Sequence, residues 1–103
     1  MLVRLTFLTV QPKEVEKMKR IFNDEIVPVV RAQKGNVGIR LLEPLNGENE
    51  YVSITEWQTA ADAEAYEASG TYRRLVDSLK DAYTSKPVLK IYNTVESKMA
   101  VTP

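Results

Sequence analysis

The sequence contains neither histidine nor cysteine among its 103 residues. The absence of cysteine excludes disulfides, a thiolate nucleophile and cysteine-ligated zinc or iron–sulfur clusters. The absence of histidine excludes an imidazole base, a serine–histidine pair and histidine ligation of a metal or haem. No acidic cluster has the spacing of a site for a hard cation. We therefore expect a protein that works without a metal or other cofactor.

Excess charge of one sign and long apolar runs are also lacking. Fourteen Lys and Arg residues balance fourteen Asp and Glu residues. Such scattered, balanced charge gives no footprint for nucleic acid or an anionic membrane. The apolar stretch over residues 1–10 is interrupted by Arg4 and is far shorter than the ~20 residues that a membrane span needs. We expect a cytoplasmic protein with no nucleic-acid and no membrane partner.

Hydrophobic periodicity divides the chain into strands and helices. Alternation with period two predicts strands over residues 2–10, 37–42, 51–57 and 88–95. Apolar residues spaced three and four apart predict a long first helix from Pro12, with a kink or break over residues 25–27, before Pro28. Two further helices are predicted over residues 59–68 and 71–83, capped by Thr59 and Thr71.

This β-α-β-β-α-β order predicts an α+β, ferredoxin-like fold with a four-stranded antiparallel sheet. We expect a single domain over residues 1–95 and a C-terminal tail over residues 96–103. Both helical regions then lie on one side of the sheet, and the other face is left bare. The residues expected on the bare face are almost all apolar, namely Val3, Leu5, Phe7, Val52, Ile54, Leu89, Ile91 and Val95.

An apolar face of this size is at the limit for a monomer, so we predict a homodimer in which two sheets pack face to face. The helix-facing side is more polar and aromatic, and a ligand pocket typically combines apolar walls with a few polar groups. The sequence thus predicts a small-molecule pocket on the helix-facing side. The residues expected on this side of the sheet are Arg4, Thr6, Arg40, Tyr51, Ser53, Thr55, Trp57, Lys90 and Tyr92.

Four stretches resemble the antibiotic biosynthesis monooxygenase (ABM) family. GIRLLEP at residues 38–44 and YVSITEWQT at residues 51–59 resemble its second and third strands. AEAYEASGTY at residues 63–72 resembles its short helix and break, and RAQKGN at residues 31–36 its exit from the first helix. The resemblance covers about residues 1–95. It implies a dimeric α/β barrel with a pocket between sheet and helices.

Some members of this family oxidise phenolic polyketides or quinols without a cofactor, and others degrade haem. The haem degraders use an Asn, a Trp and a proximal His. At these places the present chain has Thr6, Tyr66 and either Leu75 or Val76. An aliphatic side chain cannot ligate iron, so the resemblance does not imply haem degradation.

The polyketide-oxidising members carry an Asn four residues before a strand Trp. Trp57 matches this Trp, and Ser53 stands at the Asn position with one hydrogen-bonding group. The helix Tyr and the downstream Arg of those enzymes fall near Ala63 and Asp77, so neither matches.

The resemblance to the ABM family implies a cofactor-independent monooxygenase acting on a small electron-rich aromatic or quinol-type molecule. No catalytic residue is assigned. The alternatives are a non-enzymatic small-molecule-binding or accessory dimer of the same fold, and a structural dimer whose aromatic residues merely fill a dry core. The candidate ligand-binding residues are Trp57 and Tyr66 as walls, Thr6 and Ser53 as polar anchors, and Tyr72 or Arg73 near the mouth.

Overall fold

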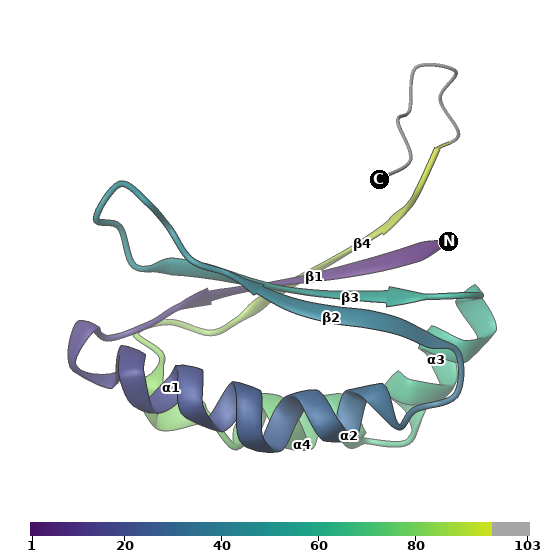
Figure 1. Cartoon of the computed structure of the whole chain (residues 1–103), viewed down its shortest axis with the longest axis horizontal. Helices are drawn as coiled ribbons and strands as arrows, with labels where there is room; N and C mark the ends of the chain where they lie inside the picture. The colour runs from purple at the N-terminus through teal and green to yellow at the C-terminus, as the bar shows by residue number, and fades with distance from the viewer. Residues whose placement is uncertain (96–103) are drawn as a thin grey trace.

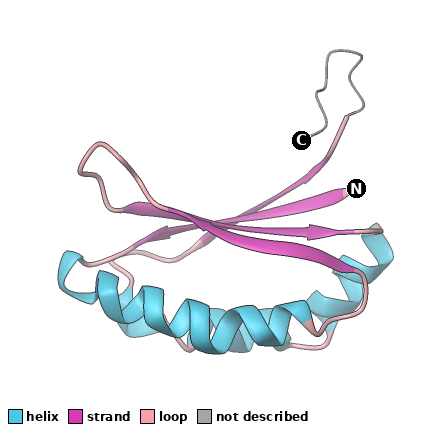
Figure 2. Cartoon of the chain, viewed as in Figure 1, coloured by secondary structure: helices cyan, strands magenta, loops and turns pink. Residues whose placement is uncertain are grey.

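Four antiparallel strands form one sheet, and all the helices cover the same face of it (Figures 1 and 2). The computed structural model describes residues 1–95; the predicted tail, residues 96–103, lies outside the described residues. The sheet order is β2-β3-β1-β4, which confirms the α+β, ferredoxin-like fold. The strands are β1 (Leu2–Thr9), β2 (Asn36–Leu42), β3 (Glu50–Trp57) and β4 (Val88–Asn93).

The first helical region is continuous but changes its winding before Pro28. Proline lacks the backbone N–H, and its ring clashes with the carbonyl one α-helical turn earlier. The chain accommodates this with a wider π-helical turn, in which the Val27 amide donates to the Phe22 carbonyl. The predicted irregularity is therefore confirmed, as a π turn. The region comprises η1 (Pro12–Glu14), α1 (Val15–Ile21), η2 (Phe22–Ile26) and α2 (Val27–Arg31).

The second helical region consists of α3 (Ala60–Ala68) and α4 (Thr71–Asp77). The Thr59 hydroxyl accepts a hydrogen bond from the Asp62 amide at 3.1 Å, which confirms the predicted N-cap of α3. The N-cap of α4 is Gly70, with φ of 80°, and not Thr71 as predicted. Glycine reaches this left-handed conformation without a steric penalty.

The predicted helix through Tyr83 is wrong, because α4 ends at Asp77 and only a short 3-10 turn, η3 (Lys80–Ala82), follows. Tyr83 instead forms an antiparallel bridge with Val10. Adjacent backbone hydrogen bonds join Gln11 to Ala82 and Thr84 to Thr9, both at 2.8 Å. These long-range bonds draw the segment onto the end of β1.

The predicted inward position of Arg40 is wrong. Arg40 pairs with Ile54 across β2 and β3, so it lies on the open face of the sheet, where it contacts Glu56 at 3.3 Å. Ile39 and Leu41 take the helix-facing positions and pack against the core. The register shift between Asn36 and Gly38 accompanies this change of face.

The face assignment of β4 is likewise reversed. Lys90 pairs with Leu5 and Tyr92 with Val3, so both lie on the open face, and the Lys90 ammonium lies 5.2 Å from the centre of the Phe7 ring. Leu89 and Ile91, predicted on the open face, pair with the inward residues Thr6 and Arg4 instead. Val95 follows the end of β4 and is exposed.

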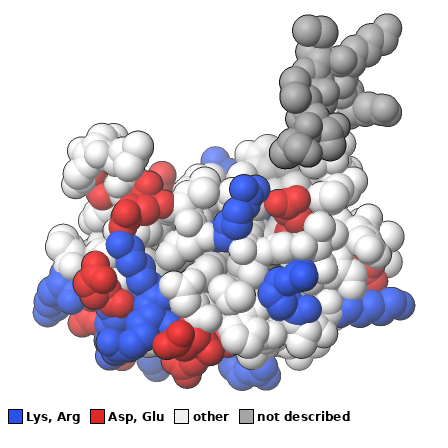
Figure 3. Space-filling view, in the orientation of Figure 1, with Lys and Arg blue, Asp and Glu red and all other residues white. Residues whose placement is uncertain are grey.

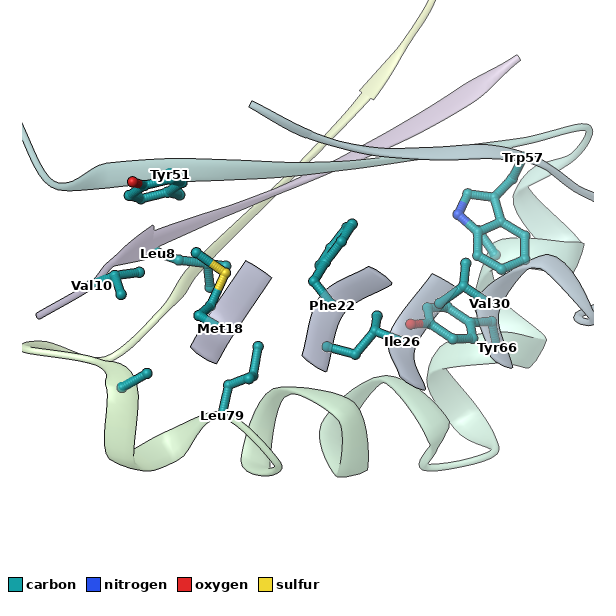
Figure 4. Close-up of a cluster of buried hydrophobic side chains, with 12 residues drawn as sticks. Leu8, Val10, Met18, Phe22, Ile26, Val30, Tyr51, Trp57, Tyr66 and Leu79 are labelled. Atoms are coloured by element: carbon teal, nitrogen blue, oxygen red, sulfur yellow. The ribbon is translucent and has the colours of Figure 1, made fainter. Parts of the chain in front are cut away.

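The hydrophobic core fills the space between the sheet and the helices (Figure 4). One face of the first helical region supplies Met18, Phe22, Ile26 and Val30, which recur at the predicted helical spacing. Acidic and basic side chains are interspersed over the helical layer (Figure 3). Among residues 1–95, no helix has the length and apolar character required to cross a membrane.

Candidate functional site

A pocket of about 40 Å³ lies beneath the sheet, between the first helical region and the pair α3–α4. Inward residues of β1, β2 and β3 form the wall on the sheet side. Apolar and aromatic helix residues form the other walls. The lining residues are Thr6, Leu8, Phe22, Ile26, Val30, Ile39, Ser53, Thr55, Tyr66, Tyr72, Leu75, Val76, Leu79 and Tyr83. Four of the six sequence-predicted ligand-binding residues thus meet at one pocket: Thr6, Ser53, Tyr66 and Tyr72.

Two hydroxyl groups form the main polar contact of the pocket. The Thr6 Oγ1 and the Tyr72 hydroxyl lie 3.0 Å apart in a hydrogen bond between β1 and α4. Ser53 is the direct cross-strand partner of Thr6, so its side chain emerges on the same face of the sheet. Alternation along β1 and β3 therefore brings both predicted polar anchors into the pocket.

Trp57 lies behind the pocket wall and does not line the pocket. Its ring is fully buried and stacks on Tyr66, with ring centres 4.7 Å apart (Figure 4). Its indole Nε1–H donates to the Thr55 hydroxyl at 2.9 Å, so the polar atom of the indole is satisfied inside the core. Trp57 therefore supports Tyr66, which is the residue that faces the pocket.

Arg73, the remaining predicted residue, is exposed on α4 and is not among the residues that line the pocket. Its neighbour Tyr72 is half-buried and contributes the phenol at that position. Successive helix residues point about 100° apart, and here the turn of α4 directs Tyr72 toward the sheet and leaves Arg73 exposed.

Arg4 is the residue of this region that the site prediction did not select. Its guanidinium is buried, contacts Glu67 at 2.9 Å, and lies 4.6 Å from the centre of the Tyr72 ring and 5.5 Å from that of Tyr66. It therefore holds both pocket tyrosines from behind by cation–π contact. The available signal was an arginine at an inward position of a strand.

Two phenols that line the pocket, those of Tyr66 and Tyr83, stay protonated at neutral pH. Burial raises the pKa of Tyr66 to about 12, although the nearby Arg4 charge acts in the opposite direction. Burial also raises the pKa of Tyr83, whose hydroxyl donates to the Val76 carbonyl at 3.0 Å. Neither tyrosine can therefore serve as a base near pH 7.

Among residues 1–95, no Asp, Glu, Lys or Arg lines the pocket. The described part of the chain also contains no group of three or more acidic residues placed to hold a metal ion. Leu75 and Val76, at the position where haem-degrading members have their iron ligand, present aliphatic side chains to the pocket. What the pocket offers a ligand is apolar contact and hydroxyl hydrogen bonds.

Solved structures share this fold over nearly the whole chain. A Nitrosomonas europaea protein, provisionally assigned as an antibiotic biosynthesis monooxygenase, has a TM-score of 0.78 at 19% identity, covering 93% of this chain and 100% of its own. A Deinococcus radiodurans protein with the same provisional assignment reaches 0.82 at 14% identity, covering 99% and 100%. SnoaB, a cofactor-independent oxygenase from Streptomyces nogalater, reaches 0.78 at 17% identity, covering 96% and 97%.

Such low identities establish a common fold and nothing finer, and no curated protein matches the sequence. The family model provides the stronger finding. The model for antibiotic biosynthesis monooxygenases matches residues 1–78, about three quarters of the chain. This chain belongs to the antibiotic biosynthesis monooxygenase family.

Proposed function

We propose that this protein is a cofactor-independent monooxygenase that oxidises a small, electron-rich aromatic or quinol-type molecule in the pocket beneath the sheet. Family membership supports an oxygenase. The class of ligand is inferred from the hydroxyl pair of Thr6 and Tyr72, which lies in an otherwise largely apolar pocket with aromatic walls. Such a site favours a flat apolar body with hydroxyl or carbonyl groups.

A cofactor-free oxygenase needs a substrate that can give electrons to triplet oxygen, as a phenolate or quinol anion can. One molecule of hydroquinone and one of dioxygen give one molecule of hydroxyquinone and one of water. One oxygen atom enters the product, the other leaves as water, and the substrate supplies all four electrons. The protein needs only to bind the substrate, exclude water and stabilise the charge that develops.

The absence of ionised groups in the pocket lining limits how a substrate anion arises. With Tyr66 protonated and no carboxylate or lysine in the lining, the substrate must lose its proton through its own acidity. The hydroxyls of Thr6, Ser53 and Tyr72 then stabilise the oxygen anion by hydrogen bonding. Substrates with the more acidic phenol groups are therefore favoured.

The pocket must open before such a molecule enters it. About 40 Å³ accommodates a few water molecules, whereas a cavity that binds benzene measures about 150 Å³. Tyr72 is the side chain best placed to move, because it is half-buried and its hydroxyl has the single Thr6 partner. We infer that Tyr72 turns aside when the substrate binds. Its hydroxyl then forms a hydrogen bond with the substrate in place of the one with Thr6.

We also propose a homodimer through the open face of the sheet. This face carries the half-buried residues Val3, Leu5, Phe7, Val52 and Ile54 at the centre of the sheet. The helices leave it uncovered (Figure 2). A second copy supplies a matching apolar surface, as expected for a two-fold interface.

Turnover of a hydroquinone panel under 18O2 tests the proposed chemistry. The expected product carries one 18O atom, forms without added metal or flavin, and is absent under anaerobic conditions. The Thr6→Val/Tyr72→Phe variant is expected to lose at least about tenfold in kcat/KM, the size of one to two hydrogen bonds. Tyr92→Phe, which removes a hydroxyl from the open face, is the matched control. A folded protein that gives no oxygen-dependent product from the panel contradicts the proposal.

The same pocket supports a second candidate, a non-enzymatic small-molecule-binding module. The observation that favours it is the lack of an ionised acid or base in the lining. Quinols that raise the melting temperature without being oxidised would establish this function, whereas turnover excludes it.

A further inference from the structure

Three tyrosines line the pocket beneath the sheet, and only one of them has a free hydroxyl group. The Tyr72 hydroxyl is paired with Thr6, and the Tyr83 hydroxyl donates to the Val76 carbonyl. Within the described part of the chain, the Tyr66 hydroxyl has no hydrogen-bond partner, although the residue is only 4% exposed. Because buried polar groups are nearly always paired, a free hydroxyl in such a position is available to a ligand.

The free hydroxyl of Tyr66 is accessible from the pocket. Among the described residues that are not exposed, the Arg4 Nε is the only side-chain nitrogen or oxygen that is both fully sealed and without a partner. The unpaired oxygen of Tyr66 is therefore not sealed, and the cavity that Tyr66 lines is this pocket. The oxygen points away from Trp57 and toward Ile26, which lines the same pocket (Figure 4).

Neighbouring side chains hold the Tyr66 ring in place. The ring stacks on Trp57 with ring centres 4.7 Å apart, and the Arg4 guanidinium lies 5.5 Å from its centre. Trp57 is itself fixed by its hydrogen bond to Thr55. A donor held in this way needs no reorganisation when a ligand binds. Tyr66 differs in this respect from Tyr72, which has to turn aside before a ligand enters.

The protonation state and the surroundings of Tyr66 suit the oxygen of an anion. Burial raises the pKa of Tyr66 to about 12, so the hydroxyl keeps its proton at neutral pH and can donate a hydrogen bond. The positive charge of Arg4 beside the ring favours negative charge at the hydroxyl end. Glu67 pairs with Arg4, but its side chain is 44% exposed, so water screens the carboxylate more than the buried guanidinium.

We propose that the Tyr66 hydroxyl is the fixed hydrogen-bond donor to the oxygen of the ligand in this pocket, and that it favours the ionised form of a phenol. The inference rests on the pocket of the proposed function and not on the oxidation. The donor stabilises a bound phenolate whether or not dioxygen then reacts with it.

Titration of bound 4-nitrophenol tests the proposal with the whole chain. The nitro group withdraws electrons, so the probe resists oxidation, and its phenolate absorbs visible light. Tyr66→Phe keeps the ring and removes the hydroxyl. This variant is expected to weaken binding of the phenolate at least about tenfold, the size of a hydrogen bond to a charged group. The neutral phenol loses only a weaker hydrogen bond, so the pKa of the bound probe should rise by at least about half a unit.

Tyr83→Phe is the matched control. Tyr83 also lines the pocket, but its hydroxyl already donates to the Val76 carbonyl, so this variant should leave the pKa of the bound probe unchanged. A second probe, 4-nitrotoluene, has a methyl group in place of the hydroxyl. It should bind Tyr66→Phe as tightly as the unaltered protein, which separates loss of the donor from a change in the shape of the pocket.

Three results would overturn the proposal. They are the absence of saturable 4-nitrophenol binding, an unchanged pKa of the bound probe in Tyr66→Phe, and an equal change of that pKa in Tyr83→Phe. Failure of the proposed oxygenase reaction is a different result. A hydroquinone panel that gives no oxygen-dependent product contradicts the oxygenase, whereas the effect of Tyr66→Phe on the bound phenolate is still expected.

Discussion

The hydroxyls of Thr6 and Tyr72 lie 3.0 Å apart and connect residues that are 66 positions apart in the sequence. Arg4, the preceding inward residue of β1, contacts the ring of the same tyrosine from 4.6 Å. Neighbouring inward positions of one strand therefore hold both the ring and the hydroxyl of Tyr72. These contacts connect α4 directly to the sheet.

Tyr72→Phe is expected to lower the free energy of unfolding by about 1 kcal/mol, because the substitution leaves the buried Thr6 hydroxyl without its partner. Urea unfolding measures the change. Tyr92→Phe is the control, since Tyr92 is 51% exposed on the open face, and it should alter stability by less than about 0.5 kcal/mol. Thr6→Val should add little in the Tyr72→Phe background; full additivity would show that the two hydroxyls do not interact.

The ion pair of Arg4 and Glu67 is expected to be worth more than that of Arg40 and Glu56. Glu67→Gln leaves a buried guanidinium without a counter-ion and should cost about 1–2 kcal/mol in free energy of unfolding. Glu56→Gln removes a similar contact from a 69% exposed arginine and should cost less than about 0.5 kcal/mol. Equal losses in urea unfolding would show that burial of Arg4 has no energetic consequence.

Sequence periodicity predicted the strands well but the faces of β2 and β4 poorly. In β1, polar Thr6 and apolar Phe7 belong to clearly different sets, so the inward set was recognisable. In β4, Val88, Leu89, Ile91 and Tyr92 put apolar residues on both faces, and periodicity cannot decide between them. Which residues of β4 face the helices is determined by the pairing of β4 with β1, a long-range contact.

The candidate site, like the faces of the sheet, was predictable from the sequence only in part. Thr6 and Ser53 were found because they lie at inward positions of the two central strands. Arg4 was not selected because its burial depends on Glu67 of α3, 63 residues away, and on the aromatic rings that cover it. The inward position of Arg4 was visible in the sequence, but the partners that bury it were not.

Stability should fall at high pH through the buried tyrosines. Burial raises the pKa of Tyr66 in the folded protein to about 12, above the ordinary value of about 10. The unfolded chain therefore releases this proton first, so the stabilisation is complete below about pH 10 and is lost as the pH rises to about 12. Burial shifts the pKa of Tyr83 in the same direction.

Urea unfolding at several pH values between about 9 and 12 measures this loss, with a slope of up to about 1.4 kcal/mol per pH unit for each tyrosine. Tyr66→Phe should reduce the slope. An unchanged slope in Tyr66→Phe would mean that the pKa of this phenol does not differ between the folded and unfolded states.

Gly35 is expected to tolerate alanine less well than Gly47. Both have a positive φ, of 80° and 78°, so each alanine incurs a backbone penalty of about 1 kcal/mol. A Cβ at Gly35 would also overlap the Asp62 carboxyl, whereas a Cβ at Gly47 meets open space. In thermal or urea unfolding, Gly35→Ala should therefore cost clearly more. The Asp62 Cβ would itself lie 2.6 Å from the new Cβ, so the whole Asp62 side chain must be removed to relieve the overlap. In an Asp62→Gly background the difference should disappear; its persistence would place the clash elsewhere.

The open face of the sheet gives the last prediction, that of the oligomeric state. Leu5 and Ile54 are cross-strand partners at the centre of this face, and a dimer would remove their apolar surface from water. Sedimentation at micromolar concentration is expected to give twice the 11.7 kDa mass of the chain. Leu5→Glu should give monomers, because a carboxylate in the interface would be desolvated without a partner. Leu45→Glu, at a 99% exposed position in the β2–β3 loop, should remain dimeric. An 11.7 kDa species alone for the unaltered chain would refute the dimer, and equal dissociation of both variants would place the interface elsewhere.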